Sequence, residues 1–186
     1  VKIIFSDTNT HFRGDENYRR SGVTDPMRIP KDPFFAHQVM WDGWVDIEEY
    51  GMHIVGHWNY DKGTVKPVYV VSTAETVELY LNGKKLPAPK QDAQFLFTFE
   101  NVAFEEGKLE AVGYNDGKEV GRHSLQTAGK PAAIKLSTIE NPTGWKADGA
   151  DVALVQIEVV DAQGRRCPLA NDMIHYELEG PAEWRG

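Results

Sequence analysis

The chain has 186 residues, of which 41% are hydrophobic, and it carries a formal net charge of −8 with a pI near 5.2. This length holds one large domain or two small ones, and the apolar fraction is sufficient for ordinary cores. The acidic balance argues against nucleic acid and anionic membranes as partners, and a neutral substrate fits it better. Cys167 is the only cysteine, so no intrachain disulfide can form. Cysteine usage therefore does not indicate the cellular compartment of the protein.

The N-terminal residues carry no targeting signal. The sequence begins Val1-Lys2, with neither an initiator Met nor the pattern of a signal peptide. The sequence has no run of about 20 apolar residues, the length that a membrane-spanning helix needs. We therefore expect the natural N-terminus to be missing.

One helix is predicted ahead of a chain otherwise patterned as strands. Residues 28–41 place Asp32 as an N-cap acceptor directly before Pro33. The helix presents an apolar surface wide enough to need a partner; its members are Phe34, Val39 and Trp41. Upstream, residues 1–5 read as a buried parallel strand. The order of elements is a strand, a long loop and a helix, followed by further strands. This order is expected of the last β/α unit of a TIM barrel followed by appended sandwiches.

Residues from about 52 onward have the alternation and turn residues of an immunoglobulin-like sandwich. The predicted strands are residues 53–58, 65–72, 76–81, 94–100, 108–114 and 119–127. Asn82-Gly83 predicts a tight hairpin, because both turn positions need φ > 0, and Asn115-Asp116-Gly117 repeats that logic. Three phenylalanines on one face of a strand are expected in the core; they are Phe95, Phe97 and Phe99.

A third segment begins at a turn-prone linker over residues 129–131. Strands are predicted over residues 133–137, 151–161 and 173–179, with a turn at residues 161–164. Three such strands are too few for an independent sandwich. We therefore interpret this segment as a second, truncated sandwich-like domain.

The loop after the first strand is the candidate site, because side chains at the carboxyl end of a barrel strand face the active-site mouth. Polar groups of this kind bind ligand hydroxyls, and aromatic rings suit an apolar ligand face; the family resemblance given below implies that this ligand is a sugar. The alternative is that these side chains only hydrogen-bond the loop to itself. The substrate-rim candidates are Asp7, Asn9, His11, Glu16 and Asn17.

No metal or cofactor site is predicted. His53 and His57 have the i, i+4 spacing of helical metal ligands, but they lie in a predicted strand. At about 3.3 Å per residue their rings would be about 13 Å apart, too far to share a zinc ion. We expect both to be structural. Residues 41–46 are expected to pack the barrel end against the sandwich rather than to stack on carbohydrate, because exposed paired tryptophans are costly unless used.

Several segments together resemble glycoside hydrolase family 2, β-galactosidase type, as found in Bacteroidetes. They are residues 5–11, 16–22, 28–41, 57–60, 66–70, 77–83 and 141–145. The resemblance covers essentially the whole chain. It implies a mainly β fold with a remnant of the eighth barrel unit over residues 1–51, an immunoglobulin-like sandwich over 52–129, and the start of a second sandwich over 130–186.

The resemblance implies a retaining glycosidase, which needs two carboxyl groups about 5–5.5 Å apart. In the family those glutamates lie on barrel strands four and seven, and both would precede Val1. The acidic residues near the helix match neither family motif; they are Glu16, Asp42, Asp46, Glu48 and Glu49. No catalytic residue is therefore assigned, and the fragment alone is expected to be inactive.

The expected partners are an oligosaccharide substrate, bound through the parent enzyme, and the remainder of the parent chain. An oligomer is possible, since an unfinished barrel exposes apolar surface. The resemblance implies a periplasmic or extracellular bacterial protein. The sugar is not determined, because galactose, glucuronate and mannose enzymes share this architecture.

A second hypothesis is a non-catalytic carbohydrate-binding or adhesive module. It requires aromatic side chains of the sandwiches to face solvent and stack on sugars. The candidates are Trp58, Tyr60, Tyr69 and Trp145.

Overall fold

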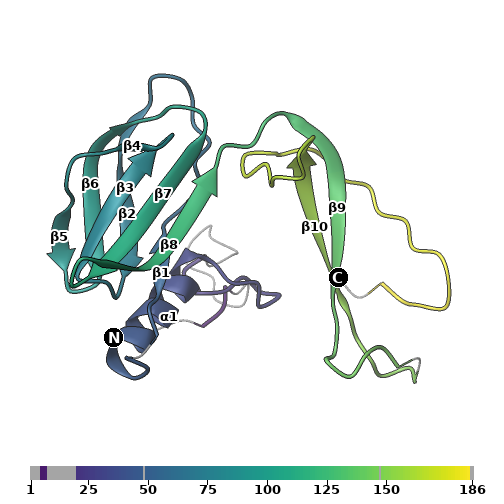
Figure 1. The fold of residues 1–186 in the computed structure, drawn as a ribbon. Helices are drawn as coiled ribbons and strands as arrows, with labels where there is room; N and C mark the ends of the chain where they lie inside the picture. Colours follow the sequence, from purple (N-terminus) through teal and green to yellow (C-terminus); the bar gives the residue numbers. More distant parts are fainter. Residues whose placement is uncertain (1–4, 8–19, 48, 147, 185–186) are drawn as a thin grey trace, which may run out of the picture. The chain divides into compact units, whose positions relative to one another are not determined.

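The computed structural model describes residues 5–7, 20–47, 49–146 and 148–184, which form two compact units, Val1–Thr127 and Ala128–Gly186 (Figure 1). The first unit contains the helix and most of the strands. Its elements are α1 (Asp32–Trp44), β1 (Met52–Ile54), β2 (Val65–Ser72), β3 (Thr76–Leu81), β4 (Lys84–Lys85), β5 (Lys90–Ala93), β6 (Leu96–Ala103), β7 (Lys108–Asn115) and β8 (Lys118–Gln126). The second unit contains β9 (Pro131–Ile139) and β10 (Leu154–Asp161).

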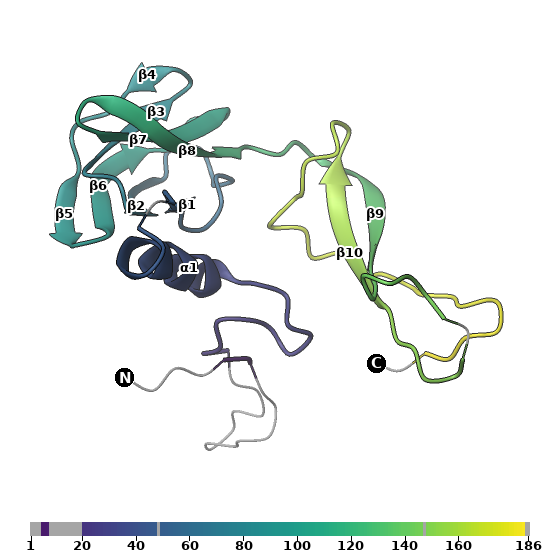
Figure 2. The ribbon, with the colours of Figure 1, turned by 60° about the horizontal axis from the view of Figure 1, so that its bottom comes forward.

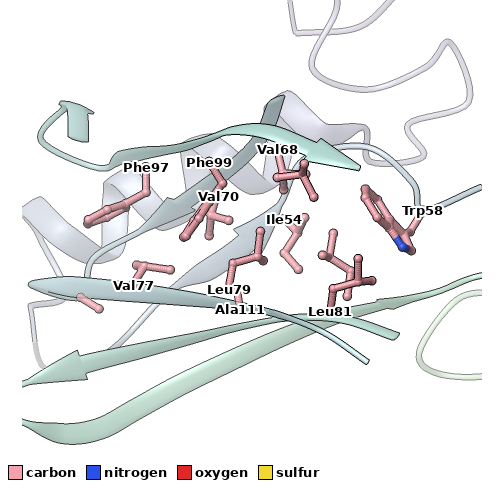
Figure 3. Packing of buried hydrophobic residues seen from close by; sticks show 13 residues of the cluster. Ile54, Trp58, Val68, Val70, Val77, Leu79, Leu81, Phe97, Phe99 and Ala111 are labelled. Atoms are coloured by element: carbon pink, nitrogen blue, oxygen red, sulfur yellow. The ribbon is translucent and has the colours of Figure 1, made fainter. Parts of the chain in front are cut away.

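The strands of the first unit form a sandwich of two antiparallel sheets, with strand orders β1-β2-β6-β5 and β4-β3-β7-β8. The two sheets face each other across one hydrophobic core (Figure 3). The predicted mainly β fold with a sandwich is therefore confirmed.

The core follows from the alternation of apolar residues along the strands. Val68 and Val70 of β2 point toward Leu79 of β3, and Phe99 of β6 joins them (Figure 3). All four are at most 4% exposed. Each such side chain contributes roughly 1.5–3 kcal/mol when buried, so this layer stabilises the sandwich.

Both predicted tight turns are confirmed by their backbone angles. Asn82 and Gly83 have φ values of 51° and 80°, and Asp116 and Gly117 have values of 49° and 73°. Left-handed backbone at consecutive positions is the geometry that two-residue hairpin loops require. These turns set the register of β3 with β4 and of β7 with β8.

Some strand bounds differ from the predicted ones. The predicted strand 53–58 is wrong in length, because β1 ends at Ile54 and Gly56 turns the chain with a φ of 92°. The predicted strand 94–100 starts late and runs on to Ala103, and Phe95 precedes it as a half-buried residue. β5 was not predicted, because all of its residues are exposed and it has no apolar alternation.

The helix begins at Asp32, within the predicted run 28–41, and the prediction of Asp32 as its N-cap is wrong by one residue. Lys31 occupies the N-cap position and makes no side-chain capping bond. The backbone cannot be helical earlier, because Arg28 has a φ of 71° and Pro30 pairs with Thr24 in a β-bridge. The carboxylate of Asp32 is directed to the sandwich instead.

Only part of the predicted apolar helix face is buried. Val39 is 4% exposed, whereas Trp41 is 59% exposed, so the expectation that Trp41 packs against the sandwich is wrong. Trp44 contacts the sandwich instead, edge-on to Phe95 with ring centroids 5.4 Å apart. Figure 2 shows α1 lying beside β1 and β2, the strands it contacts. The helix thus contacts the sandwich through Trp44 in its C-terminal turn and through Asp32 in its N-terminal turn.

The second unit is built on the antiparallel pair of β9 and β10 (Figure 1). The turn predicted at residues 161–164 is confirmed: Gly164 has a φ of 76° and donates to the carbonyl of Asp161. The predicted strand 173–179 is wrong. Its residues are mostly exposed and belong to no sheet in the described part of the chain, because β9 and β10 pair with each other.

Candidate functional site

Asp7 is the one substrate-rim candidate whose structure is described. The others lie outside the described residues; they are Asn9, His11, Glu16 and Asn17. The carboxylate of Asp7 is 6% exposed and accepts hydrogen bonds from the Gly22 N–H at 2.8 Å and from Lys31 Nζ at 3.0 and 3.1 Å. Two charge-assisted interactions therefore fix it inside the loop.

Backbone pairing surrounds this carboxylate. Thr24 is 1% exposed, donates its N–H to the Phe5 carbonyl at 3.0 Å and accepts from the Asp7 N–H at 2.9 Å. A Cβ at Gly22 would lie 2.2 Å from the Asp7 nitrogen, so only glycine fits there. We call Asp7, Gly22, Thr24 and Lys31 the loop framework. It brings residue 7 next to residues 20–22.

A second polar cluster joins α1 to the sandwich. Asp32 accepts from His53 Nε2 at 2.7 Å and from the Gly56 N–H at 3.0 Å. The Phe35 ring stacks on His53 with centroids 4.8 Å apart. The His123 ring lies 5.0 Å from that of His53. We call these residues, Asp32, Phe35, His53, Gly56 and His123, the junction cluster.

The electrostatics of the junction cluster follow from these contacts. The hydrogen bond from His53, with that from Gly56, holds the pKa of Asp32 below its usual range against the opposing effect of burial. Burial, and then the charge of a protonated His53, lower the pKa of His123. The cluster therefore favours an ionised Asp32 and a neutral His123.

His57 lies in a different environment from His53. Its ring stacks on Tyr60 with centroids 4.6 Å apart, and its Nδ1 accepts from the Asn59 N–H at 3.1 Å. Burial, and then the nearby Lys66 ammonium, lower the pKa of His57. The two histidines thus bond to separate partners. Among the described residues, no group of three or more His, Cys, Asp or Glu side chains could hold a metal ion.

The aromatic residues of the binding-module hypothesis are not all accessible. Trp58 is 2% exposed and donates its indole N–H to the Glu105 carbonyl at 3.0 Å, so the expectation that it faces solvent is wrong. Tyr60 is half-buried and packs edge-on against Phe104. Tyr69 and Trp145 are exposed. No helix in the described part of the chain is long and apolar enough to cross a membrane.

Sequence reasoning missed the junction cluster. Asp32 has the signature of a helix cap, and His53 is explained as a residue of a strand. His123 accepts a hydrogen bond from the N–H of Ile54, which is 69 residues away in the chain. No local spacing links these positions, and only the single histidine pattern at residues 53 and 57 could have drawn attention to them.

Two family matches cover most of the chain outside the helix. Residues 63–121 match Domain of unknown function (DUF4982), and residues 135–186 match Glycoside hydrolase family 2 C-terminal domain 5.

The chain is also similar to curated proteins. It is 47% identical over 169 residues to a β-glucuronidase of Formosa agariphila, covering 90% of this chain and 17% of that protein. It is 31% identical over 160 residues to the β-galactosidase BoGH2A of Bacteroides ovatus, covering 86% of this chain and 18% of that protein. The chain therefore spans less than a fifth of the length of either relative.

Solved structures agree with these relatives. A β-glucuronidase from glycoside hydrolase family 2 superposes with a TM-score of 0.81 at 47% identity, over 90% of this chain and 17% of that one. A β-glycosidase from Bacteroides vulgatus superposes with a TM-score of 0.75 at 26% identity, over 89% of this chain and 20% of that one. The chain belongs to glycoside hydrolase family 2 and corresponds to C-terminal domains of its members.

Proposed function

We propose that this chain is the C-terminal part of a retaining β-glycosidase that removes terminal β-linked sugars, with β-glucuronides as substrates. The observation that carries the proposal is the 47% identity to a β-glucuronidase over 90% of the chain. The galactosidase resemblance is supported at lower identity, by the 31% match to a β-galactosidase. The net charge of −8 does not exclude an anionic sugar as substrate, because the cations nearest a binding site set its local potential.

In this proposal the chain finishes one side of the active-site mouth. The loop framework supports this role, because it holds both ends of the segment 8–19 with a buried carboxylate and its ammonium partner. That segment contains the remaining rim candidates, Asn9, His11, Glu16 and Asn17. Asp7 then acts as a positioning residue, since its own oxygens already have partners within the loop framework.

The catalytic carboxyl pair is proposed to lie in the rest of the parent protein. A retaining enzyme protonates the leaving oxygen with one carboxylic acid while the other carboxylate attacks the anomeric carbon. The glycosyl-enzyme ester formed in this step is then hydrolysed by water, with net retention of configuration. The role of this chain is to complete the binding surface and to support it with the sandwich.

The test uses the whole parent protein and the 186-residue chain side by side. We expect the parent protein to hydrolyse nitrophenyl β-glucuronide in preference to nitrophenyl β-galactoside, with the β-anomer of the sugar formed first in proton NMR spectra. Preference for the galactoside would contradict the substrate assignment, and first formation of the α-anomer would contradict retention. The chain alone should release no nitrophenol, and release by the purified chain would contradict the proposed location of the carboxyl pair.

A calorimetric titration of the chain alone separates this proposal from the binding-module hypothesis. Tyr69 and Trp145 are 42% and 61% exposed, so they are the aromatic residues of that hypothesis most available for stacking. Heat of binding to β-linked oligosaccharides that disappears in Y69A or W145A would favour the module. We expect no such heat.

A further inference from the structure

The hydrogen bonds of the junction cluster require specific protonation states. The Ile54 N–H donates to His123 Nδ1 at 3.2 Å, so this nitrogen must carry a lone pair. His53 donates from Nε2 to Asp32, which it can do either as a neutral ring or as an imidazolium. His123 is therefore the member of the cluster whose observed bond exists only in the neutral state.

Among the residues that the structure describes, few charged groups face His123. Asp32 from α1 and His53 from β1 are the titratable groups that act on it. On the neighbouring strand β7 its register partner is Ala111, which carries no charge. Arg122, the adjacent residue of β8, forms its ion pairs with Glu119 and Glu110. The fate of the cluster on acidification is thus set by three side chains.

Proton uptake by His123 would act on both sides of the junction. It would place an N–H of the ring opposite the N–H of Ile54, so this bond would be lost. It would also place a cation 5.0 Å from the His53 ring, which carries a proton on Nε2 toward Asp32. Asp32 attracts the new cation, but its effect on His123 is smaller than the opposing effect of His53. The repulsion would act on His53, whose Nε2–H bond to Asp32 holds α1 to the sandwich.

We propose that the junction cluster is a pH-sensitive lock between α1 and the sandwich, closed while His123 is neutral and released when His123 takes up a proton. Burial and His53 hold the pKa of His123 below its ordinary value, so the folded unit binds this proton less readily than the unfolded chain. The stabilisation from neutral His123 is complete above the unfolded pKa of about 6.5 and is lost as the pH falls toward the folded pKa.

Hydrogen exchange of two backbone amides in the 186-residue chain tests the lock. The Ile54 N–H reports the bond to His123, and the Gly56 N–H reports the bond from the sandwich to Asp32 of α1. After correction for intrinsic exchange, we expect several-fold loss of protection at both amides between pH 7.5 and pH 5. Loss at Ile54 alone would mean a local ring rotation and would overturn the proposal, as would unchanged protection at both.

His123→Gln is the decisive variant, because the glutamine oxygen can accept from Ile54 but does not titrate. We expect both amides in H123Q to stay protected across this pH range. His37→Gln is the matched control. His37 lies on α1, the helix that the lock holds; it is exposed, and in the described contacts it bonds only to the Pro33 carbonyl. H37Q should behave like the unmodified chain. If H123Q does not fold, the protonation of His123 in the unmodified chain is followed by NMR titration. The lock is rejected if the protection of the Gly56 amide does not fall as His123 takes up its proton.

Discussion

Lys31 Nζ lies 3.0 Å from Asp7 Oδ1 and 3.1 Å from Oδ2, although 24 residues separate the two in the chain. The pair joins the residues that precede and follow the segment 8–19 in the chain. Asp7 is buried and Lys31 is partly exposed. The ammonium of Lys31 and the Gly22 N–H stabilise the negative charge of the buried carboxylate. A residue that the sequence suggests as a ligand for sugar thus bonds to Gly22 and Lys31 of its own chain.

Replacing Asp7 by alanine is expected to lower the free energy of unfolding by about 1.5–3 kcal/mol, the usual contribution of a charge-assisted hydrogen bond. Asp7→Asn should cost less, because the amide oxygen can still accept from Gly22. Urea unfolding checks both. The control is Asp61→Ala, which changes an exposed aspartate. In the whole enzyme D7A should raise KM more than D61A does; equal KM values would argue against a positioning role.

Gly107 and Gly63 form a matched pair for a test of backbone and space. Both have positive φ values, 135° and 89°, which strain any other residue. A Cβ at Gly107 would lie 1.8 Å from Asn82 Oδ1, the acceptor of the Lys108 N–H, whereas Gly63 has nothing within 4 Å. G63A should cost about 1–3 kcal/mol from strain alone. G107A should cost clearly more in urea unfolding, and equal costs would show that the Asn82 side chain moves away freely.

Asp161 is expected to be the main stabilising carboxylate of the second unit. It accepts from the backbone N–H groups of Gly129, Gln163 and Arg165, and from the Arg165 guanidinium at 2.6 Å. Burial raises the pKa of Asp161, but these bonds outweigh burial and hold the pKa far below its usual range.

The pH dependence of the second unit follows from this depressed pKa. The stabilisation is present above the unfolded pKa of about 3.9 and is lost as the pH falls below about 4. Asp161→Asn should weaken protection of the Gln163 and Arg165 amides from hydrogen exchange at pH 7, whereas Asp172→Asn, at an exposed position, should not. Unchanged protection in D161N would mean that the charge is unimportant to this turn.

Cys167 should react slowly with thiol reagents in the folded chain. The side chain is 9% exposed, and burial, followed by the charge of Asp161, raises the pKa of its thiol. Since the thiolate is the reactive form, both effects reduce its reaction rate. Titration with a chromogenic disulfide at pH 8 should give a slow phase in buffer and a fast one in urea. A fast phase in buffer would contradict the burial.

The alternation of apolar residues was sufficient to predict most strands of the sandwich. The bounds of β2 and β3 match the prediction, and the turns at Asn82-Gly83 and Asp116-Gly117 adopt the positive φ values that their residues favour. These features are local, because side-chain period and turn chemistry act within a few residues. Prediction was wrong for residues 173–179, since a strand also needs a partner.

The roles of the polar residues depended on the tertiary structure. Asp32 precedes a helical proline and has the pattern of a cap, yet His53 and Gly56 occupy its oxygens. Trp41 fits the apolar face of the helix, but Trp44 makes the contact with the sandwich. A carboxylate or an indole binds the partner that the fold brings within reach. The sequence alone therefore determined most strands of the sandwich and its two tight turns, and long-range contacts decided which side chains face solvent, the core or one another.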